Sequence, residues 1–188
     1  MARVLFFNLN VFLIYNIMPK SRFQTRLMCE NEEAVVTPLP GNAYIQKLID
    51  VVGQAQHTVD IMMFQWCWYK GRNHLHIQKF NQGVIGLLKR GVKFRVIMDK
   101  QTHGQSVTKQ NLHTAEFLRE NGARVKFGPQ FPCMHSKIFI IDDNIVVLGS
   151  HNLSDRGTSM NEETSVLIYS RKVAMEYKRY YESVWNRF

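Results

Sequence analysis

The sequence predicts an α/β fold in which one β-sheet is covered by helices on both faces. Segments with apolar residues at helical spacing alternate along the chain with short runs rich in β-branched and large apolar residues, and this alternation is typical of the class. The predicted helices cover residues 42–56, 75–90, 109–121 and 172–185. The predicted strands cover residues 34–37, 58–64, 92–98, 124–127, 136–141, 145–148 and 164–169.

The first 33 residues stand outside this alternation. Residues 4–18 are mostly apolar, but the run includes three asparagines and is shorter than the ~20 residues that a membrane-spanning helix needs. Three interpretations stay open: a membrane anchor or degenerate signal, a packed or peripheral element, and an extension upstream of a true start at Met18. Residues 19–33 are polar and charged, which predicts a linker.

The localisation depends on residues 4–18 and is left open. An anchor would make the protein membrane-associated, and the basic residues that follow it would keep the domain on the cytoplasmic side. A signal would make the protein exported. If the segment is neither, the protein is expected to be cytoplasmic.

Prolines and glycines are expected to end several elements. Pro38 and Pro40 should stop the strand at residues 34–37, because proline cannot donate a ladder hydrogen bond. Gly91 follows the helix at residues 75–90, at the position of a C-cap glycine. Gly122 should end the helix at residues 109–121 in the same way.

A hairpin is predicted in the second half of the chain. The strands at residues 136–141 and 145–148 are separated only by Asp142-Asp143-Asn144, a sequence suited to a tight turn. After the hairpin in the sequence, the strand at residues 164–169 and the last helix complete the predicted domain, which covers residues 34–188.

The composition fits a globular domain that has a polyanionic partner. The chain has 188 residues, of which 45% are hydrophobic and 21% charged, and a formal net charge of +9. Such a charge favours nucleic acid or an anionic membrane surface as the partner. The three cysteines, Cys29, Cys67 and Cys133, form no CxxC pair, so the sequence predicts no metal site and no cofactor.

Four polar side chains around the hairpin are expected to converge. His135 and Lys137 are two residues apart on a strand and therefore share a face. Ser150 and Asn152 are also two apart and share a face if the chain stays extended there. An imidazole, an ammonium, a hydroxyl and a carboxamide aimed at one point can bind and attack a phosphodiester.

The pattern H-x-K-x4-D followed by six residues and G-S-x-N, as it stands in residues 135–152, resembles the phospholipase D superfamily and its HKD motif. The resemblance implies a phospholipase D-like mixed β-sheet in a single domain. Its small single-motif members are bacterial Nuc-type endonucleases and the mitochondrial cardiolipin-hydrolase type. The Nuc type is favoured here, because the Cys/His cluster of some mitochondrial members is missing.

The resemblance also implies a reaction through a covalent phosphohistidine, without a metal ion. His135 would attack phosphorus, Lys137 would neutralise charge, and Ser150 and Asn152 would donate hydrogen bonds. The second ring nitrogen of His135 needs an acceptor, for which the resemblance suggests Glu163, with Glu162 as the alternative.

Asp142 belongs to the motif and is counted with the catalytic set. It lies five residues from Lys137, however, and falls on the opposite face of a regular strand. We therefore predict a structural or supporting role for this carboxylate.

The leaving oxygen needs a proton, and the resemblance implies that a second HKD histidine supplies it. The chain contains one H-x-K sequence, so the second imidazole must come from another subunit. The sequence therefore predicts a two-fold homodimer in which two copies of His135 face one phosphate. The remaining histidines are expected to be ordinary surface or core residues: His57, His74, His76, His103, His113 and His151.

Aromatic and basic residues lie together after the strand at residues 58–64. Trp68, Tyr69, Lys70 and Arg72 suit single-stranded nucleic acid, whose bases stack and whose phosphates need cations. The same cluster suits a lipid interface, where Trp and Tyr also gather. The structural alternative is that Trp66 is a core residue and that Lys89, Arg90 and Lys93 form a solvated helix end.

The predicted function is a metal-independent nuclease that acts on single-stranded DNA or RNA. The alternatives are a phospholipase acting on an anionic lipid such as cardiolipin, and an inactive nucleic-acid-binding module.

Overall fold

The computed structural model describes residues 25–29, 32–101, 105–129 and 132–188. The apolar run at residues 4–18 lies outside this part of the chain. In the part that is described, no helix is both long and apolar enough to span a membrane.

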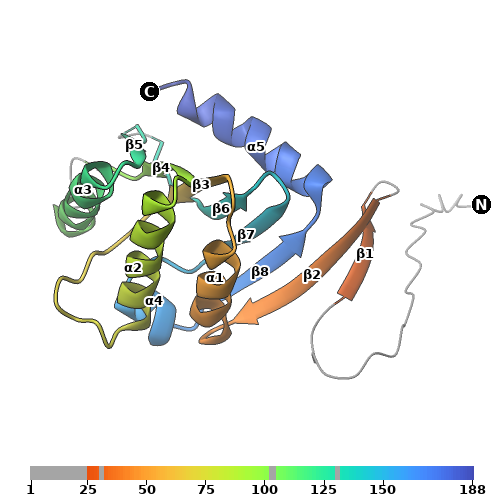
Figure 1. The fold of residues 1–188 in the computed structure, drawn as a ribbon, viewed down its shortest axis with the longest axis horizontal. Helices are drawn as coiled ribbons and strands as arrows, with labels where there is room; N and C mark the ends of the chain where they lie inside the picture. Colours follow the sequence, from red (N-terminus) through yellow and green to blue (C-terminus); the bar gives the residue numbers. More distant parts are fainter. Residues whose placement is uncertain (1–24, 30–31, 102–104, 130–131) are drawn as a thin grey trace, which may run out of the picture.

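One mixed β-sheet forms the centre of the molecule, which confirms the predicted α/β class (Figure 1). Its strands lie in the order β1-β2-β8-β7-β6-β3-β4-β5. The strands β3, β4 and β5 are parallel to one another, and all other neighbours are antiparallel. The bounds are β1 Thr25–Cys29, β2 Glu32–Pro40, β3 Thr58–Met63, β4 Lys93–Met98, β5 Arg124–Phe127, β6 Lys137–Ile141, β7 Ile145–Gly149 and β8 Thr164–Tyr169.

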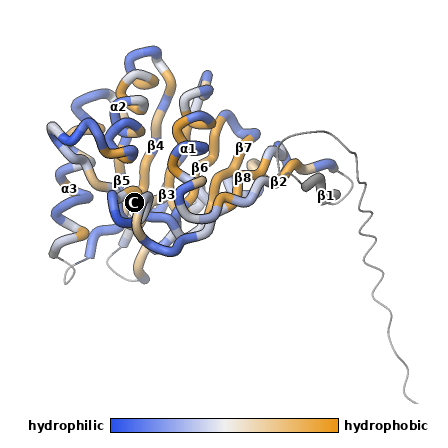
Figure 2. Tube along the Cα trace, turned by 90° about the horizontal axis from the view of Figure 1, so that it is seen from below, coloured by the Kyte–Doolittle hydropathy of each residue, from blue (hydrophilic) through white to orange (hydrophobic). Residues whose placement is uncertain are grey.

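Helices cover both faces of this sheet. The bounds are α1 Ala43–Gly53, α2 His76–Lys89, α3 Gln105–Glu120, α4 Asp155–Ser159 and α5 Arg171–Trp185. Buried residues of α1, α2 and α3 pack on one face, and those of α5 pack on the other. Neighbouring residues of β3 show the division, since Ile61 belongs to the first core and Met62 to the second. Hydrophobic residues follow the central strands, as Figure 2 shows.

Most element ends lie where the sequence predicts them. Gly91 and Gly122 follow α2 and α3 with φ of 87° and 95°, a backbone conformation that glycine adopts without strain. The helix α3 begins four residues before the predicted start, at Gln105 instead of residue 109. The five-residue helix α4 was not predicted; the Ser154 hydroxyl caps it by accepting a hydrogen bond from the Gly157 N–H.

The predictions for the first strands were wrong. The supposed linker at residues 19–33 contains β1 and the start of β2, and β2 continues through Pro38 and Pro40 to its end. β1 pairs with β2 only up to Val36, whereas β8 pairs with β2 as far as Pro40. The Gly41 N–H donates to the Glu163 carbonyl, so the alternate residues of β2 in phase with Gly41 face β8. The Pro38 and Pro40 nitrogens therefore face the opposite edge, where β1 no longer pairs with β2. Proline is compatible with a strand at such an edge.

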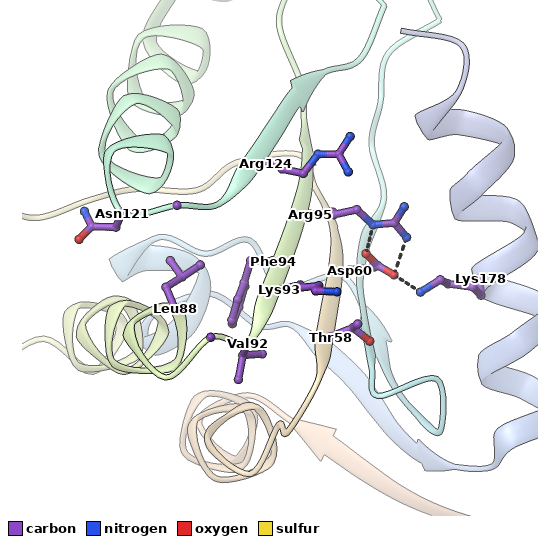
Figure 3. A pocket seen from close by; sticks show the side chains of 12 residues that line it. Thr58, Asp60, Leu88, Val92, Lys93, Phe94, Arg95, Asn121, Arg124 and Lys178 are labelled. Carbon is purple, nitrogen blue, oxygen red and sulfur yellow. Dashed lines mark hydrogen bonds and ion pairs between the residues drawn. The ribbon is translucent and has the colours of Figure 1, made fainter.

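Ion pairs attach α5 to the sheet at the end where β3 and β4 begin. Asp60 is buried on β3 and receives both Arg95 and Lys178, and Arg95 also pairs with Glu182 of α5. A cavity of about 450 Å³ opens beside these groups (Figure 3). It lies at the opposite end of the strands from the His135-Lys137 segment, because Lys137 pairs with Met63, the last residue of β3.

The turn between β6 and β7 is fixed by the carboxylate of Asp142. This residue and Asp143 have φ of 48° and 52°, as a tight hairpin turn requires. The Asp142 carboxylate accepts hydrogen bonds from three consecutive backbone N–H groups, those of Gln56, His57 and Thr58, each at 2.8 Å. The carboxylate thus holds the hairpin against the start of β3.

These three hydrogen bonds also determine how Asp142 titrates. Desolvation raises the pKa of this carboxyl, but the backbone hydrogen bonds outweigh desolvation and lower the pKa below its usual value. A carboxyl whose pKa is lower in the folded chain stabilises the fold above its unfolded pKa, about 3.9, and that stabilisation is lost as the pH falls through its folded pKa.

We expect Asp142→Asn to reduce the free energy of unfolding at pH 7 by about 1–3 kcal/mol, because asparagine keeps one acceptor oxygen and loses the charge. The difference from the wild type should shrink in urea unfolding series taken from pH 7 to pH 3. Asp50→Asn, a change on the exposed side of α1, is the control and should leave stability nearly unchanged. An Asp142→Asn protein as stable as the wild type at pH 7 would contradict this role.

Candidate active site

His135 and Lys137 lie together where β6 begins, next to the end of β3. The Lys137 ammonium lies 3.1 Å from Nδ1 and 3.2 Å from Nε2 of His135, and it donates to the His135 carbonyl at 2.7 Å. Lys137 is only 8% exposed, whereas His135 is exposed. The structure thus brings together the two residues that the strand alternation places on one face.

Phe64 covers one side of this pair. Its backbone N–H donates to the Ser136 carbonyl at 3.0 Å, which extends the pairing of β3 with β6 by one step. The Phe64 ring centroid lies 4.6 Å from that of His135 and 4.9 Å from the Lys137 ammonium. The aromatic face therefore contacts the cation and the imidazole together. Phe64 is one of the residues of the site that the sequence analysis did not identify.

The electrostatics favour a neutral imidazole. Burial and then the positive charge of Lys137 lower the pKa of His135, and Asp99 acts in the opposite direction. Desolvation likewise lowers the pKa of Lys137, against the influence of Cys133, Glu163 and Asp99. A neutral ring nitrogen beside a cation is the arrangement that a nucleophilic histidine needs when it approaches an anionic phosphate.

Ser150 follows β7 and is held against the start of β8. Its hydroxyl accepts from the Thr164 N–H at 3.0 Å and lies 3.2 Å from the Thr164 carbonyl. The strands are so close here that a Cβ on Gly149 would lie 2.4 Å from the Ser165 Cα. Glycine is therefore required before Ser150, which explains the first residue of the G-S-x-N sequence.

Asn152 carries a buried side-chain oxygen, Oδ1, that the described residues leave unpaired. The next residue, Leu153, donates its N–H to the Gln65 carbonyl at 2.9 Å, so the segment after β7 lies against the segment after β3 that contains Phe64. A buried polar atom without a partner is unusual in a native fold and is expected where a ligand or water binds.

Glu163 belongs to the same region but contacts other groups than expected. It precedes β8, and its carboxylate accepts from Asn161 Nδ2 at 3.2 Å. Desolvation raises its pKa, but hydrogen bonds from Ser150 and Asn161, with the charges of His151 and Lys137, lower the pKa overall. Within the described residues no hydrogen bond joins Glu163 to His135, so the expected partnership stays a prediction. Glu162, the alternative, is exposed.

Asp142 lies away from these residues. It follows β6 at the far end of that strand from Lys137, and its carboxylate contacts the backbone at the start of β3. The HKD aspartate is thus part of the support for β6, in the structural role that the strand alternation predicts.

His151 is a core histidine, although it stands between Ser150 and Asn152. It is 1% exposed and stacks on Tyr44 with a centroid distance of 4.0 Å. One ring nitrogen lies 2.7 Å from Ser165 Oγ, and the other lies 3.1 Å from the Gly41 carbonyl, to which it donates. Both nitrogens are occupied within the fold.

Residues 68–72 have mixed environments. The Trp68 ring stacks on Phe117 of α3 at 3.6 Å, and Trp68 and Lys70 line a cavity between α2 and α3. The Tyr69 hydroxyl accepts from the Asp155 N–H at 3.1 Å, while Lys70 and Arg72 are exposed. Tyr69 therefore supports α4, and the stacking and charged groups open to a ligand are Trp68, Lys70 and Arg72.

Asp99 is the other residue that the sequence analysis missed. It follows β4 directly, is fully buried, and its charge influences both His135 and Lys137. Its position at the carboxyl end of a strand parallel to β3 was a signal that could have identified it.

Comparison with known proteins agrees with this geometry. Residues 48–185 match the family described as cardiolipin synthase, PLD-like domain. The match covers most of the chain, so the chain belongs to the phospholipase D-like family.

The similar proteins include a mitochondrial cardiolipin hydrolase and two bacterial Nuc proteins. The chain is 23% identical over 147 residues to a mitochondrial cardiolipin hydrolase from Chlamydomonas reinhardtii, covering 77% of this chain and 58% of that protein. Among solved structures, it resembles Nuc, a phospholipase D family member from Salmonella typhimurium, with a TM-score of 0.69, 18% identity, and coverage of 82% and 95% of the two chains. It also resembles NucT from Helicobacter pylori, with a TM-score of 0.67, 19% identity, and coverage of 82% and 97%.

His151 provides a test of pH-dependent stability. Burial lowers the pKa of His151, so the folded chain protonates this imidazole at a lower pH than the unfolded chain, in which its pKa is about 6.5. The stability it contributes is therefore complete above about pH 6.5 and is lost as the pH falls.

We expect His151→Gln to weaken the decline of the unfolding free energy between pH 7 and pH 5, because glutamine does not titrate. Urea unfolding of both proteins at several pH values measures the two slopes. Equal slopes would show that His151 titrates alike in the folded and unfolded chains.

Proposed function

We propose that this protein is a metal-independent phosphodiesterase that cleaves nucleic acid, preferably single-stranded DNA or RNA, through a phosphohistidine. The observation that carries the proposal is the contact between His135 and Lys137, in which a cation lies about 3 Å from an imidazole whose pKa is lowered. The ammonium attracts the phosphodiester, and the neutral ring keeps a lone pair for attack.

The first step forms a bond between a ring nitrogen of His135 and phosphorus, as the P–O bond to the leaving group breaks. In the proposal, Lys137 neutralises the non-bridging oxygens, and Ser150 and the Asn152 amide donate hydrogen bonds to them, Ser150 by turning its hydroxyl away from the Thr164 carbonyl. The leaving oxygen takes a proton from a second imidazole. Water then attacks phosphorus, gives a proton to that imidazole and releases His135.

The second imidazole belongs to a second copy of the chain in this proposal. The sequence has one H-x-K segment, and His135 is exposed, so two copies related by a two-fold axis can bring both rings to one phosphate. One ring is neutral and the other protonated, so the two titrate as a coupled pair.

Nucleic acid is the substrate that the surface favours. The net charge of +9 suits a polyanion, and Lys70 and Arg72 are exposed beside the cavity that Trp68 lines. The solved structures of Nuc and NucT give the same fold and support this choice by analogy.

We expect His135→Ala to lower cleavage of a labelled single-stranded oligonucleotide by at least ~10³-fold, because the nucleophile is lost. The assay contains chelator, which should leave wild-type activity unchanged. His76→Ala, which removes an exposed histidine at the start of α2, is the matched control. Activity that survives in His135→Ala, or wild-type activity that disappears with chelator, would contradict the mechanism.

A shared site makes a quantitative prediction for mixed subunits. When wild type and His135→Ala exchange subunits at equal concentration, about one quarter of the dimers are fully wild type. Activity should therefore fall to about a quarter of that of an equal total concentration of wild-type subunits. A fall to about one half would indicate subunits that act independently, and sedimentation of the active protein as a monomer would exclude the shared site.

A phospholipase that hydrolyses an anionic lipid is the second candidate. The similarity to a protein named mitochondrial cardiolipin hydrolase favours it, although this chain spans only 58% of that protein. The same imidazole and ammonium can serve either phosphodiester. Vesicles containing cardiolipin, incubated in chelator beside the oligonucleotide assay, separate the two substrates. Trapping of a phosphorylated His135 would exclude an inactive binding module.

A further inference from the structure

A buried carboxylate lies next to the His135 segment and has no role in the steps described above. Asp99 follows β4 and is 0% exposed. Its Oδ1 accepts a hydrogen bond from the Met134 N–H at 3.1 Å and lies 3.5 Å from Cys133 Sγ. Its Oδ2 has no hydrogen-bond partner among the described residues. The carboxylate thus holds the backbone immediately before His135.

A hydrogen bond from helix α3 holds the backbone carbonyl of Asp99. The side-chain amide of Asn111, a buried residue of α3, donates to the Asp99 carbonyl at 2.9 Å and to the Phe64 carbonyl at 2.8 Å. The Asn111 carbonyl oxygen accepts from the Trp66 N–H at 2.9 Å. One buried amide therefore joins the ends of β3 and β4 and sets the relative positions of Asp99 and Phe64.

Two of the groups that interact with this carboxylate can carry positive charge. His135 and Lys137 both interact electrostatically with Asp99, and the Cys133 thiol lies beside it. The negative charge of Glu163, which precedes β8, raises the pKa of Lys137. Of the carboxylates in the described residues, Asp99 is the one that raises the pKa of His135.

We propose that Asp99 is a positioning residue for the reaction, which holds the backbone before His135 and stabilises the positive charge that develops on the imidazole when it bonds to phosphorus. The inference rests on the proposed phosphodiesterase function. A fully buried carboxylate with one unpartnered oxygen lowers the stability of the fold. Groups of this kind are common at functional sites, and Asp99 contacts the backbone directly before His135.

The titration of Asp99 leads to a second consequence. Desolvation raises the pKa of Asp99, and the Met134 N–H and the nearby positive charges only partly offset this effect. A carboxyl with a raised folded pKa stabilises the fold fully below its unfolded pKa, and this contribution is lost as the pH rises through the folded pKa. Removing the charge should therefore leave the fold equally stable or more stable at pH 7.

The test is Asp99→Asn, which keeps the shape and one acceptor oxygen and removes the charge. We expect kcat/KM for the oligonucleotide to fall by about 10- to 100-fold, mostly through kcat, because the imidazole is less well placed and its developing charge is less stabilised. The pH–rate profile should move to lower pH, because the histidines lose a negative neighbour. The melting temperature at pH 7 should not decrease. Asp50→Asn makes the same change of net charge on α1 and should alter none of these.

The decisive measurement does not need activity. The pKa of His135, followed by NMR in wild type and Asp99→Asn without substrate, should be lower in the variant. An unchanged His135 pKa together with an unchanged pH–rate profile would overturn the inference. If the protein cleaves no phosphodiester, the proposed function fails while this titration still tests the coupling of Asp99 to His135.

A reciprocal experiment covers the case in which Asp99→Asn does not fold. By linkage, His135→Gln must change the titration of the Asp99 carboxyl as much as Asp99 changes that of His135. The carboxyl carbon signal of Asp99, recorded against pH in wild type and His135→Gln, measures this. Identical Asp99 titrations in the two proteins would overturn the inference.

Discussion

The antiparallel pairing of β6 with β3 in the middle of the sheet is the constraint on which the site depends. This ladder ends with Lys137 opposite Met63, and one further hydrogen bond joins Phe64 to Ser136. At the other end of β6, the Asp142 carboxylate accepts hydrogen bonds from three consecutive backbone N–H groups at the start of β3. A strand fixed at both ends cannot slip in register, and a slip of one residue would turn His135 and Lys137 to the opposite face.

The charges around His135 suit the proposed attack of a neutral imidazole on an anionic phosphodiester. Lys137 supplies a cation for a phosphate, and burial together with this cation lowers the pKa of the imidazole. Asp99, which follows β4, acts in the opposite direction on His135, whereas Glu163, which precedes β8, raises the pKa of Lys137. The proposed mechanism needs a His135 that is neutral before attack and positive when bonded to phosphorus, which the opposing influences of Lys137 and Asp99 suit.

Much of the fold could be predicted because its signals are local. The periodicity of α2 and α5, the glycines after α2 and α3, and the turn at Asp142 each act within a few residues. β1 and the course of β2 through Pro38 and Pro40 could not be predicted, because only the neighbouring strands decide whether a proline nitrogen faces a partner or an open edge. Phe64 reaches the site through tertiary pairing, which the order of residues in the chain does not express. Asp99 stands at the end of a predicted strand, but its contact with the Met134 N–H also depends on tertiary structure.

The prolines of β2 also restrict how copies of this chain can associate. Where β1 no longer covers β2, Pro38 and Pro40 present nitrogens that have no hydrogen to donate. A strand from another molecule cannot extend the sheet along this stretch, so the protein is protected there against edge-to-edge polymerisation.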